Sequence, residues 1–266
     1  MNDAVPVMEL QQLSIGYAAG GDKKPLFSNI SAQISQGMLI GLFGRNGIGK
    51  STLLRTMAGL QPSTGGTIML SGRQLCKHKL SEIAKHIALV PSKPQHISGL
   101  SVTDMVGTGR YRFTNWLGVE REHDTEAIHK ALKVTALTHL ATRDSATLSD
   151  GELQRASIAR SLVQDTPLVI LDEPTAFLDM GNKYKTVSLL KELTQTTGKG
   201  VLFSSHDLTL ALQVCDILWI MTDQGFYAQP PDQLIQNGIL DRLFYSHGLI
   251  FDRNILNYTF NTTQHE

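Results

Sequence analysis

Short apolar runs alternate with longer amphipathic stretches along this chain. The runs at residues 38–43, 168–171 and 201–203 are apolar throughout, as strands are when both faces of their sheet are covered. Stretches with a helical period lie between them. The alternation predicts βαβ units around a mostly parallel sheet. Roughly the first thirty residues, together with residues 66–73, predict shorter antiparallel strands beside it.

Between about residues 96 and 165 the pattern becomes helical, with few strand signals. Residues 125–140 gather their apolar positions on one side of a helix. This predicts a helical subdomain inserted into the α/β core. Over residues 229–266 we expect a short C-terminal extension that contains a helix near residues 232–244. Residues 1–266 are therefore expected to form one α/β domain.

A glycine-rich turn follows the first buried strand. Its sequence, GRNGIGKST at residues 44–52, fits the P-loop pattern G-x-x-x-x-G-K-[ST]. The glycines of this pattern let backbone N–H groups turn inward around phosphates, and Lys50 reaches the β and γ oxygens. The Ser51 hydroxyl can ligate Mg²⁺, and the following helix directs its positive end at the anion. A plain glycine-rich turn is the alternative, but the position between an apolar strand and a helix favours a nucleotide site in a P-loop NTPase fold.

Two acidic residues follow the next buried strand. The segment LVILDEPT brings Asp172 and Glu173 to the carboxyl end of that strand, where ligands bind in α/β sheets. Asp172 is expected to hold Mg²⁺, directly or through water, and Glu173 to polarise the attacking water. His206, in FSSHDL, reaches the same edge from the third strand, so we expect it to contact the γ-phosphate. The predicted catalytic residues are Lys50, Glu173 and His206.

Composition and charge narrow the classes of function. The chain has 24 Lys and Arg residues against 24 Asp and Glu residues, so its charge does not predict bulk nucleic-acid binding. Cys76 and Cys215 form no CxxC pair, which argues against a disulfide framework or a thiolate metal site. No apolar run approaches the ~18 residues that span a bilayer, and the N-terminus has no apolar signal region. We expect a protein without a membrane anchor of its own.

The segment LSDGELQR, residues 148–155, has two interpretations. Ser149 and Glu152 fit the S-x-x-E capping box of a helix start, and apolar residues recur after them at helical spacing. A helix N-terminus is also an anion site. On these residues alone the structural interpretation is the simpler one, and both stay open.

Together the motifs resemble those of the ATP-binding-cassette (ABC) ATPases, over nearly the whole chain. In the family's order they are Tyr17, the P-loop at 44–52, the signature at 148–152, the pair Asp172-Glu173, the D-loop at Phe177-Leu-Asp179 and the switch histidine His206. The resemblance implies ATP as the nucleotide, Mg²⁺ as its metal and ATP hydrolysis as the reaction.

The resemblance also implies a pair of chains. In this family two cassettes pack head to tail, and the signature of one closes over the γ-phosphate held by the P-loop of the other. Ser149 and Gly151 would bind that phosphate in trans, Asp179 would cross the interface, and Tyr17 would stack on adenine. Because each motif occurs once, the chain needs a second copy to complete a site. The residues implied for nucleotide binding are Tyr17, Gly44, Asn46, Gly47, Gly49, Lys50, Ser51, Thr52, Ser149, Gly151, Glu152 and Asp179.

Two segments depart from the family's pattern. The usual signature LSGGQ is here LSDGE, which keeps the serine and the second glycine but alters the polar contacts. The family also has a glutamine directly after a strand, where it senses the γ-phosphate and Mg²⁺. In ALVPSKPQHISGLSV an ungapped count back from residues 100–102 puts Ser92 there, whereas Gln95 fits only after a shift of three residues. We favour Ser92, which can ligate Mg²⁺ through water but is too short for glutamine-based sensing.

The segment VGTGRYRFTNWLG, residues 106–118, and the stretch 148–179 resemble importers of iron–siderophore complexes, haem and vitamin B12. This implies a homodimeric ATPase subunit that binds transmembrane permease subunits at the cytoplasmic face of the inner membrane. A substrate-binding protein would be an indirect partner, and nucleic acid would not be one. The alternatives are a soluble cassette with a regulatory or nucleic-acid-linked role, an ATP-binding clamp with little turnover, and a transporter subunit for another cargo. Glu173 and His206 argue against the clamp.

Overall fold

The buried apolar runs form the centre of a six-stranded sheet in the computed structural model, as predicted. The model describes residues 6–19, 22–113, 122–176, 178–243, 249–253 and 255–260. The strand order is β10-β9-β3-β8-β7-β6, and all neighbours run parallel except β10, which is antiparallel to β9. The strands are β3 (Leu39–Gly44), β6 (Ile87–Val90), β7 (Leu168–Leu171), β8 (Gly200–Ser204), β9 (Ile217–Thr222) and β10 (Gly225–Gln229). Because the five parallel strands point the same way, their carboxyl ends share one edge.

The N-terminal strands are antiparallel, as predicted, but longer than expected. The second sheet has the order β2-β1-β4-β5, with β1 (Met8–Ala19), β2 (Asp22–Ile34), β4 (Gly65–Leu70) and β5 (Arg73–Gln74). The pairing of β1 with β2 continues through register shifts beside Leu13, close to the left-handed residue Gln12. Such bulges interrupt the alternation of apolar and polar residues, so the length of this hairpin was hard to predict.

Strands β9 and β10 were not predicted from the sequence. Ile217–Thr222 is almost entirely buried, and its run ILWIMT would have supplied the signal for a central strand. Strand β10 is only partly buried at every position, which is typical of the outermost strand of a sheet.

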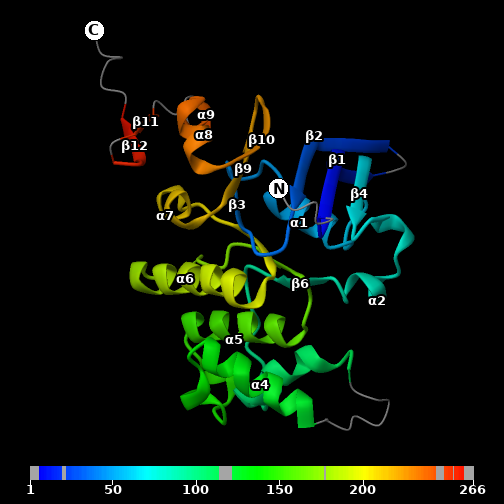
Figure 1. The fold of residues 1–266 in the computed structure, drawn as a ribbon, viewed down its shortest axis with the longest axis vertical. Helices are drawn as coiled ribbons and strands as arrows, with labels where there is room; N and C mark the ends of the chain where they lie inside the picture. Colours follow the sequence, from blue (N-terminus) through cyan, green and yellow to red (C-terminus); the bar gives the residue numbers. More distant parts are fainter. Residues whose placement is uncertain are drawn as a thin grey trace.

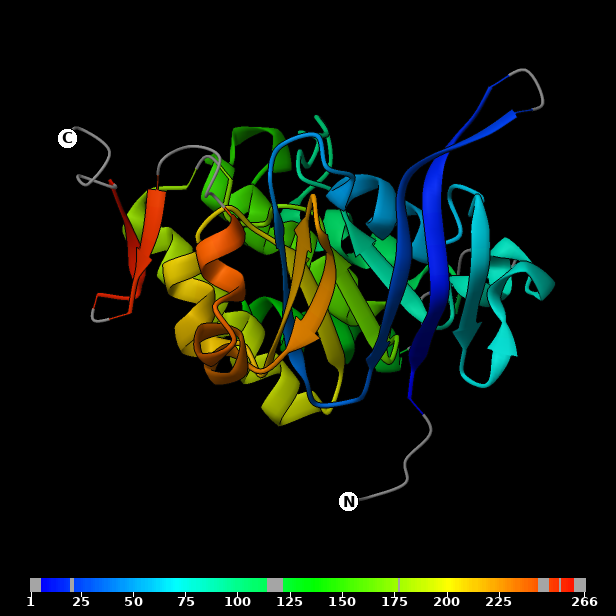
Figure 2. The same ribbon diagram turned by 90° about the horizontal axis from the view of Figure 1, so that it is seen from above.

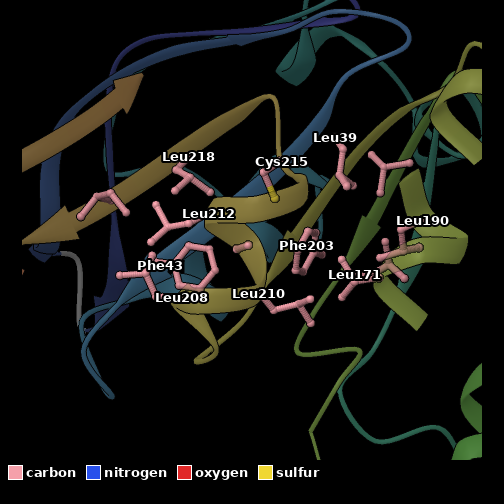
Figure 3. Packing of buried hydrophobic residues seen from close by; sticks show 14 of the residues in the cluster. Leu39, Phe43, Leu171, Leu190, Phe203, Leu208, Leu210, Leu212, Cys215 and Leu218 are labelled. Atoms are coloured by element: carbon pink, nitrogen blue, oxygen red, sulfur yellow. The ribbon is translucent and has the colours of Figure 1, made fainter. Parts of the chain in front are cut away.

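Helices cover the six-stranded sheet on one face and the antiparallel sheet lies against the other (Figures 1 and 2). Helix α1 (Lys50–Met57) contributes Leu53 to a hydrophobic cluster that it shares with the antiparallel sheet and with Trp219 of β9. On the opposite face the sheet packs against α6 (Met180–Thr197) and α7 (Leu208–Val214), as Figure 3 shows for Phe203, Leu208 and Leu190. The edge at which the carboxyl ends of the parallel strands meet is therefore held between two packed layers.

The stretch predicted to be helical consists of helices and turns over its described residues. Its elements are α3 (Val102–Gly107), η2 (Thr108–Arg110), α4 (Glu122–Val134), η3 (Thr138–Leu140), η4 (Ser145–Thr147) and α5 (Asp150–Val163). They enclose their own hydrophobic cluster, which contains Val102, Leu132 and Ala156. The helix expected over residues 125–140 ends earlier, since Ala136 adopts a left-handed φ of 55°. The subdomain boundaries stay a prediction.

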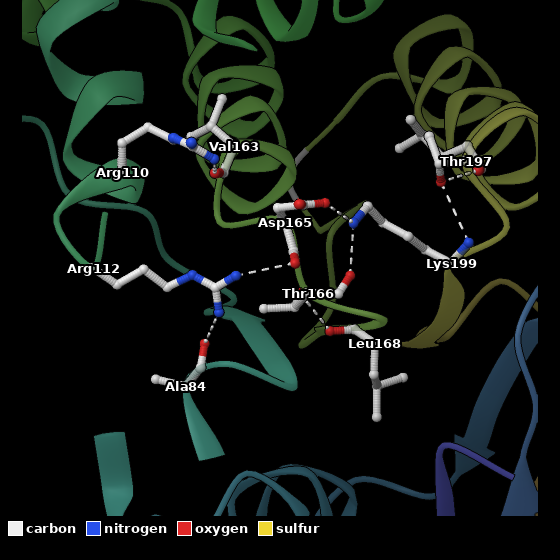
Figure 4. Close-up of polar contacts among 10 residues, drawn as sticks. Ala84, Arg110, Arg112, Val163, Asp165, Thr166, Leu168, Thr197 and Lys199 are labelled. Atoms are coloured by element: carbon white, nitrogen blue, oxygen red, sulfur yellow. Dashed lines mark hydrogen bonds and ion pairs between the residues drawn. The ribbon is translucent and has the colours of Figure 1, made fainter. Parts of the chain in front are cut away.

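Two cationic side chains tie this helical part to the sheet (Figure 4). The Arg112 guanidinium donates to the carbonyl of Ala84, before β6, at 3.3 Å and to that of Asp165, after α5, at 3.2 Å. Lys199 lies 3.2 Å from the Asp165 carboxylate and donates to the Thr166 carbonyl at 2.7 Å. These bonds set the position of α5 relative to the strand that follows it.

The prediction of a single helix near residues 232–244 is wrong. The chain forms α8 (Pro231–Gln236) and α9 (Ile239–Leu243), because Gly238 between them takes a left-handed φ of 65°. A hairpin of β11 (Leu249–Asp252) and β12 (Asn257–Phe260) follows. Its Tyr258 hydroxyl donates a hydrogen bond to the Leu240 carbonyl of α9 at 2.7 Å.

Two further short helices, η1 (Leu75–Lys77) and α2 (Leu80–Ile83), connect β5 to β6. Among the described residues, no helix has the length and apolar character that a membrane crossing requires.

Candidate nucleotide-binding site

The P-loop joins the carboxyl end of β3 to α1. Gly47 and Gly49 take φ values of 80° and 117°, a left-handed conformation that glycine adopts without strain. Lys50 is 6% exposed, and its Nζ donates to the Gly44 carbonyl at 2.8 Å and to the Arg45 carbonyl at 3.4 Å. The loop thus wraps around the ammonium group, and a side chain added at Gly47 would meet open space. This cradle fits the phosphates of a nucleotide.

The electrostatics of Lys50 suit an anion. Burial lowers the pKa of the Lys50 ammonium, while the carboxylates of Glu173 and Asp172 act in the opposite direction. A buried cation lacks the hydration that water would supply. Phosphate oxygens would replace that hydration and stabilise the charged form.

Asp172 lies one residue beyond β7 and is 9% exposed. Its Oδ1 accepts a hydrogen bond from the Ser51 hydroxyl at 3.1 Å and another from the Ser204 hydroxyl at 2.8 Å. Hydroxyl and carboxylate oxygens are ligands that Mg²⁺ prefers, and it usually adds water and phosphate oxygens. Ser51 of the P-loop and Asp172 after β7 therefore fit as the residues that would hold a Mg²⁺ ion.

Glu173 and His206 meet at the same edge. The Nε2 atom of His206 lies 2.7 Å from Oε1 of Glu173, with side-chain exposures of 48% and 28%. Glu173 also has a positive φ of 49°, which is uncommon outside glycine and costs on the order of 1–3 kcal/mol. The backbone N–H of Glu173 donates to the Ser204 hydroxyl at 2.8 Å. Glu173 is thus held by one contact of its carboxylate and one of its backbone N–H.

Tyr17 stands near the end of β1, beside the P-loop helix. Its hydroxyl lies 3.4 Å from the Thr52 hydroxyl, and 60% of the residue is exposed. The hydroxyl of Tyr17 is therefore in contact with Thr52, while much of the ring is exposed. This arrangement leaves an aromatic face available to a flat base.

The signature begins α5 with the predicted capping box. The backbone N–H of Ser149 donates to Oε2 of Glu152 at 2.8 Å, its hydroxyl donates to the same oxygen at 2.9 Å, and the Glu152 N–H lies 3.4 Å from the Ser149 hydroxyl. The N–H bond from Ser149 is the main reason that the pKa of Glu152 is lowered. The Asp150 side chain is 75% exposed and lies 4.0 Å from His96. The structural interpretation of this segment is confirmed, and its phosphate contact stays a prediction.

Asp179 caps the neighbouring helix α6. Its carboxylate accepts from the backbone N–H of Asn182 at 2.8 Å and from the Asn182 side-chain amide at 2.7 Å. The backbone bond from Asn182 is the main cause of a lowered Asp179 pKa. A Cβ added at Gly151 would lie 3.7 Å from the Asn182 side chain, so the starts of α5 and α6 are neighbours. Phe177, the first D-loop residue, lies outside the described residues.

Ser92 and Gln95 differ in their surroundings. Val90 pairs with Leu171, so Ser92 leaves β6 at the same edge at which Asp172 leaves β7. Ser92 is partly buried and lines a cavity of about 260 Å³ together with Asp150. Gln95 is exposed and is not part of that lining. The surroundings favour Ser92 as the residue in the glutamine position, which stays a prediction.

Sequence reasoning missed Ser204. This fully buried serine ends β8 and bonds to both acidic positions, the Asp172 carboxylate and the Glu173 amide. Its position in FSSHDL, where a buried strand gives way to polar residues, was an available signal. The pairing of β7 with β8, which brings Leu171 opposite Phe203, was needed to show its neighbours.

A comparison with known families identifies this arrangement. Residues 27–176, which include the P-loop, the signature and the acidic pair, match the ABC transporter family. The chain belongs to the ABC transporter family. It is an ATPase cassette of that family, with the mostly parallel sheet and the antiparallel sheet that the sequence predicted.

Known members of the family resemble the chain over most of its length. A petrobactin import ATP-binding protein of Bacillus anthracis is 35% identical over 89% of this chain and 86% of its own. The ferric enterobactin transport ATP-binding protein of Escherichia coli (strain K12) is 32% identical over 95% of this chain and 92% of its own. Among solved structures, a transporter assigned to the metal-chelate type, in an inward-facing conformation, matches with a TM-score of 0.77 and 27% identity, covering 91% of this chain and 90% of that one.

The segment resembling the importer subgroup lies only partly within the described residues. Residues 106–113 are described, and residues 114–118 are not. Arg110 is 8% exposed, contacts Asp124 at 2.6 Å and donates to the Val163 carbonyl at 3.0 Å. Tyr111, next to it, is 73% exposed. Arg110 is thus part of the packing of the helical stretch, and Tyr111 lies on its surface.

Proposed function

We propose that this chain is the ATP-hydrolysing subunit of a membrane importer for iron–siderophore, haem or cobalamin complexes. The observation that carries the hydrolytic part is the connected set of side chains at one sheet edge, in which Ser51 contacts Asp172 and Glu173 contacts His206. The import proteins that the chain resembles, one for petrobactin and one for ferric enterobactin, support the cargo class.

Each residue of the edge has a role in the proposed reaction. Lys50 binds β and γ oxygens, and Ser51 and Asp172 hold Mg²⁺, which neutralises charge that develops on the phosphates. Glu173 orients the attacking water and accepts its proton, because a carboxylate at hydrogen-bond distance is a competent base. His206, 2.7 Å from Glu173, holds that carboxylate in place and contacts the γ-phosphate.

The site is completed by a second copy of the chain. In the proposed homodimer Ser149 and Gly151 of one copy bind the γ-phosphate at the P-loop of the other, and Asp179 contacts the partner beside them. The exposed Tyr17 ring stacks on adenine. Ser92 takes the glutamine position of the family and could contact a Mg²⁺ ion through water. Closure of the two copies around ATP would then drive a conformational change in the permease.

Transmembrane permease subunits are the proposed partners, with a substrate-binding protein acting through them. The ATPase subunit would therefore lie at the cytoplasmic face of the inner membrane as a peripheral protein. Its selectivity for cargo would come from these partners, because the cassette itself contacts nucleotide and permease only.

Purification from native membranes tests this proposal. A tagged chain is expected to bring down a permease with many membrane spans. A strain without the chain is expected to lose uptake of one of three labelled cargoes: a ferric siderophore or haem with radioactive iron, or labelled cobalamin. The wild-type chain should restore uptake, and Glu173→Gln should not. Association with soluble proteins or nucleic acid alone, or normal uptake of all these cargoes, would contradict the proposal.

A further inference from the structure

Ser204 lies at the edge of the sheet that carries the P-loop and the acidic pair, at the carboxyl ends of β3, β7 and β8, which we call the catalytic edge. It is the last residue of β8 and is fully buried. Its neighbours across the sheet are Leu42 in β3 and the end of β7, so it stands between the strand that carries the P-loop and the strand that carries the acidic pair.

The Ser204 hydroxyl uses both of its hydrogen-bonding functions on the acidic pair. It donates to Oδ1 of Asp172 and accepts from the backbone N–H of Glu173, in both cases at 2.8 Å. One hydroxyl thus binds the side chain of the first residue and the main chain of the second. The peptide that links Asp172 to Glu173 is held from both sides.

That peptide needs an external restraint. Glu173 has a left-handed φ of 49°, a conformation that a residue with a side chain rarely adopts without one. A rotation of the Asp172–Glu173 peptide would relieve the strain, but it would remove the Glu173 N–H from Ser204. A buried N–H without an acceptor is unfavourable, so the Ser204 bond opposes this rotation. The direction of the Glu173 carboxylate follows from the same φ.

The two hydroxyls on Asp172 are not equivalent. Ser51 also donates to Oδ1 of Asp172, at 3.1 Å, but its oxygen fits a Mg²⁺ ligand. Ser204 lies within the sheet, where it can keep its bond to Asp172 when Ser51 contacts the metal. Groups that orient a metal-binding carboxylate commonly affect metal affinity as strongly as activity.

We infer that Ser204 is a positioning residue for ATP hydrolysis, which holds the Asp172–Glu173 peptide so that one carboxylate faces the metal and the other the attacking water. The inference rests on the proposed roles of Asp172 and Glu173. It assigns the hydroxyl no contact with nucleotide, metal or water.

Ser204→Ala, in the full-length chain, tests this inference. Hydrolysis is expected to fall by about 10²-fold, the scale of a misplaced catalytic group. The Mg²⁺ concentration for half-maximal activity should rise about 10-fold, while binding of a fluorescent ATP analogue without Mg²⁺ should stay within about 2-fold. In the nucleotide-free chain, amide hydrogen exchange in peptides covering residues 168–176 should become at least roughly 10-fold faster.

Ser161→Ala is the matched control. Ser161 is also a buried serine, 2% exposed, and its hydroxyl donates to the Ile158 carbonyl within α5 at 2.7 Å, away from the acidic pair. It should lose a hydrogen bond without changing Mg²⁺ dependence or exchange over residues 168–176. Equal changes in Ser161→Ala and Ser204→Ala would overturn the inference, as would unchanged exchange and unchanged Mg²⁺ dependence in Ser204→Ala.

Two further measurements keep the result decisive. If Ser204→Ala does not fold, Ser204→Cys has the same expectations, because a thiol is similar in volume but accepts and donates hydrogen bonds weakly. If Glu173→Gln retains hydrolysis, the proposed role of Glu173 fails. The exchange experiment still reports whether Ser204 holds the peptide, so the two failures are distinguishable.

Discussion

The catalytic edge of the sheet and the start of α5 both suit anions, but they are built differently. At the edge, hydrogen bonds connect groups from distant parts of the sequence, such as Ser51, Asp172 and Ser204. At the start of α5, Ser149 and Glu152 bond mainly to each other, within one turn. The first is a network of tertiary contacts, and the second is a local helix cap.

The difference shows which site can act within one chain. The carboxylates at the edge have defined positions, which proton transfer and metal binding require. The capping box satisfies its own groups, and its acidic residues would face a phosphate from another copy with unfavourable charge. For Ser149 to bind phosphate it must leave Glu152, and the exposed Asp150 must turn away or pair with a cation. The catalytic edge is therefore preorganised, whereas the signature would have to rearrange in order to bind a phosphate.

The largest expected effect concerns the catalytic edge. Glu173→Gln keeps the shape of the side chain but removes the proton acceptor, so steady-state hydrolysis should fall by ~10²-fold or more. Binding of ATP should survive, and an ATP-bound dimer should accumulate in size-exclusion chromatography. Glu192→Gln, on the exposed side of α6, is the control and should behave as wild type. Near-normal hydrolysis by Glu173→Gln would exclude it as the base.

A mixed dimer tests whether the start of α5 acts on the other copy. One tethered chain carries Gly151→Asp and the other carries Lys50→Ala, so a head-to-tail pair has one site with both lesions and one with neither. Each homodimer should trap no nucleotide, because one has a negative charge against the phosphate and the other lacks its cation. The mixed dimer should trap ATP at one site. Folded, paired chains that trap none would return the segment to a purely structural role.

A smaller effect is expected at Tyr17, the residue proposed to stack on adenine. Tyr17→Ala removes an aromatic contact of about 0.5–1.5 kcal/mol, so KM for ATP should rise about 2- to 12-fold with little change in kcat. Tyr17→Phe keeps the ring and loses only the contact with Thr52, which is 3.4 Å away, so it should stay close to wild type. An unchanged KM in Tyr17→Ala would show that the ring does not contact the base.

The smallest effect concerns the charge in the capping box. Because the folded pKa of Glu152 is lowered, its charge contributes stability above the ordinary glutamate pKa, and that contribution is lost as pH falls through the folded value. Glu152→Gln keeps the cap hydrogen bonds, so at neutral pH it should lose only about 0.3–1 kcal/mol of charge–dipole stabilisation. The difference in Tm from wild type should shrink as the pH falls below the ordinary glutamate pKa, and it should vanish once Glu152 is protonated in the folded chain. Glu126→Gln, on α4, is the control, and a difference that grows in acid would contradict the assignment.

The sequence alone determined the local features of this protein. The P-loop, the acidic pair after β7 and the capping box at Ser149 are each defined by a few consecutive residues. Backbone conformation and hydrogen bonding over one turn or one strand dictate such patterns, so they could be predicted without knowledge of neighbouring strands. Strands β3, β7 and β8 were predicted for the same reason, since burial on both faces leaves a continuous apolar run.

The tertiary structure decided which distant residues meet. Ser204 reaches Asp172 across 32 positions of sequence, and Tyr17 reaches Thr52 across 35, because strand order and register set these pairs. Register shifts also concealed the length of the first hairpin, and a left-handed glycine at 238 divided the C-terminal helix. In parallel sheets, partners are separated by whole helices, and no local pattern records which strand lies alongside. The acidic residues were therefore visible in the sequence, but the contacts of Ser204 with both of them were visible only in the fold.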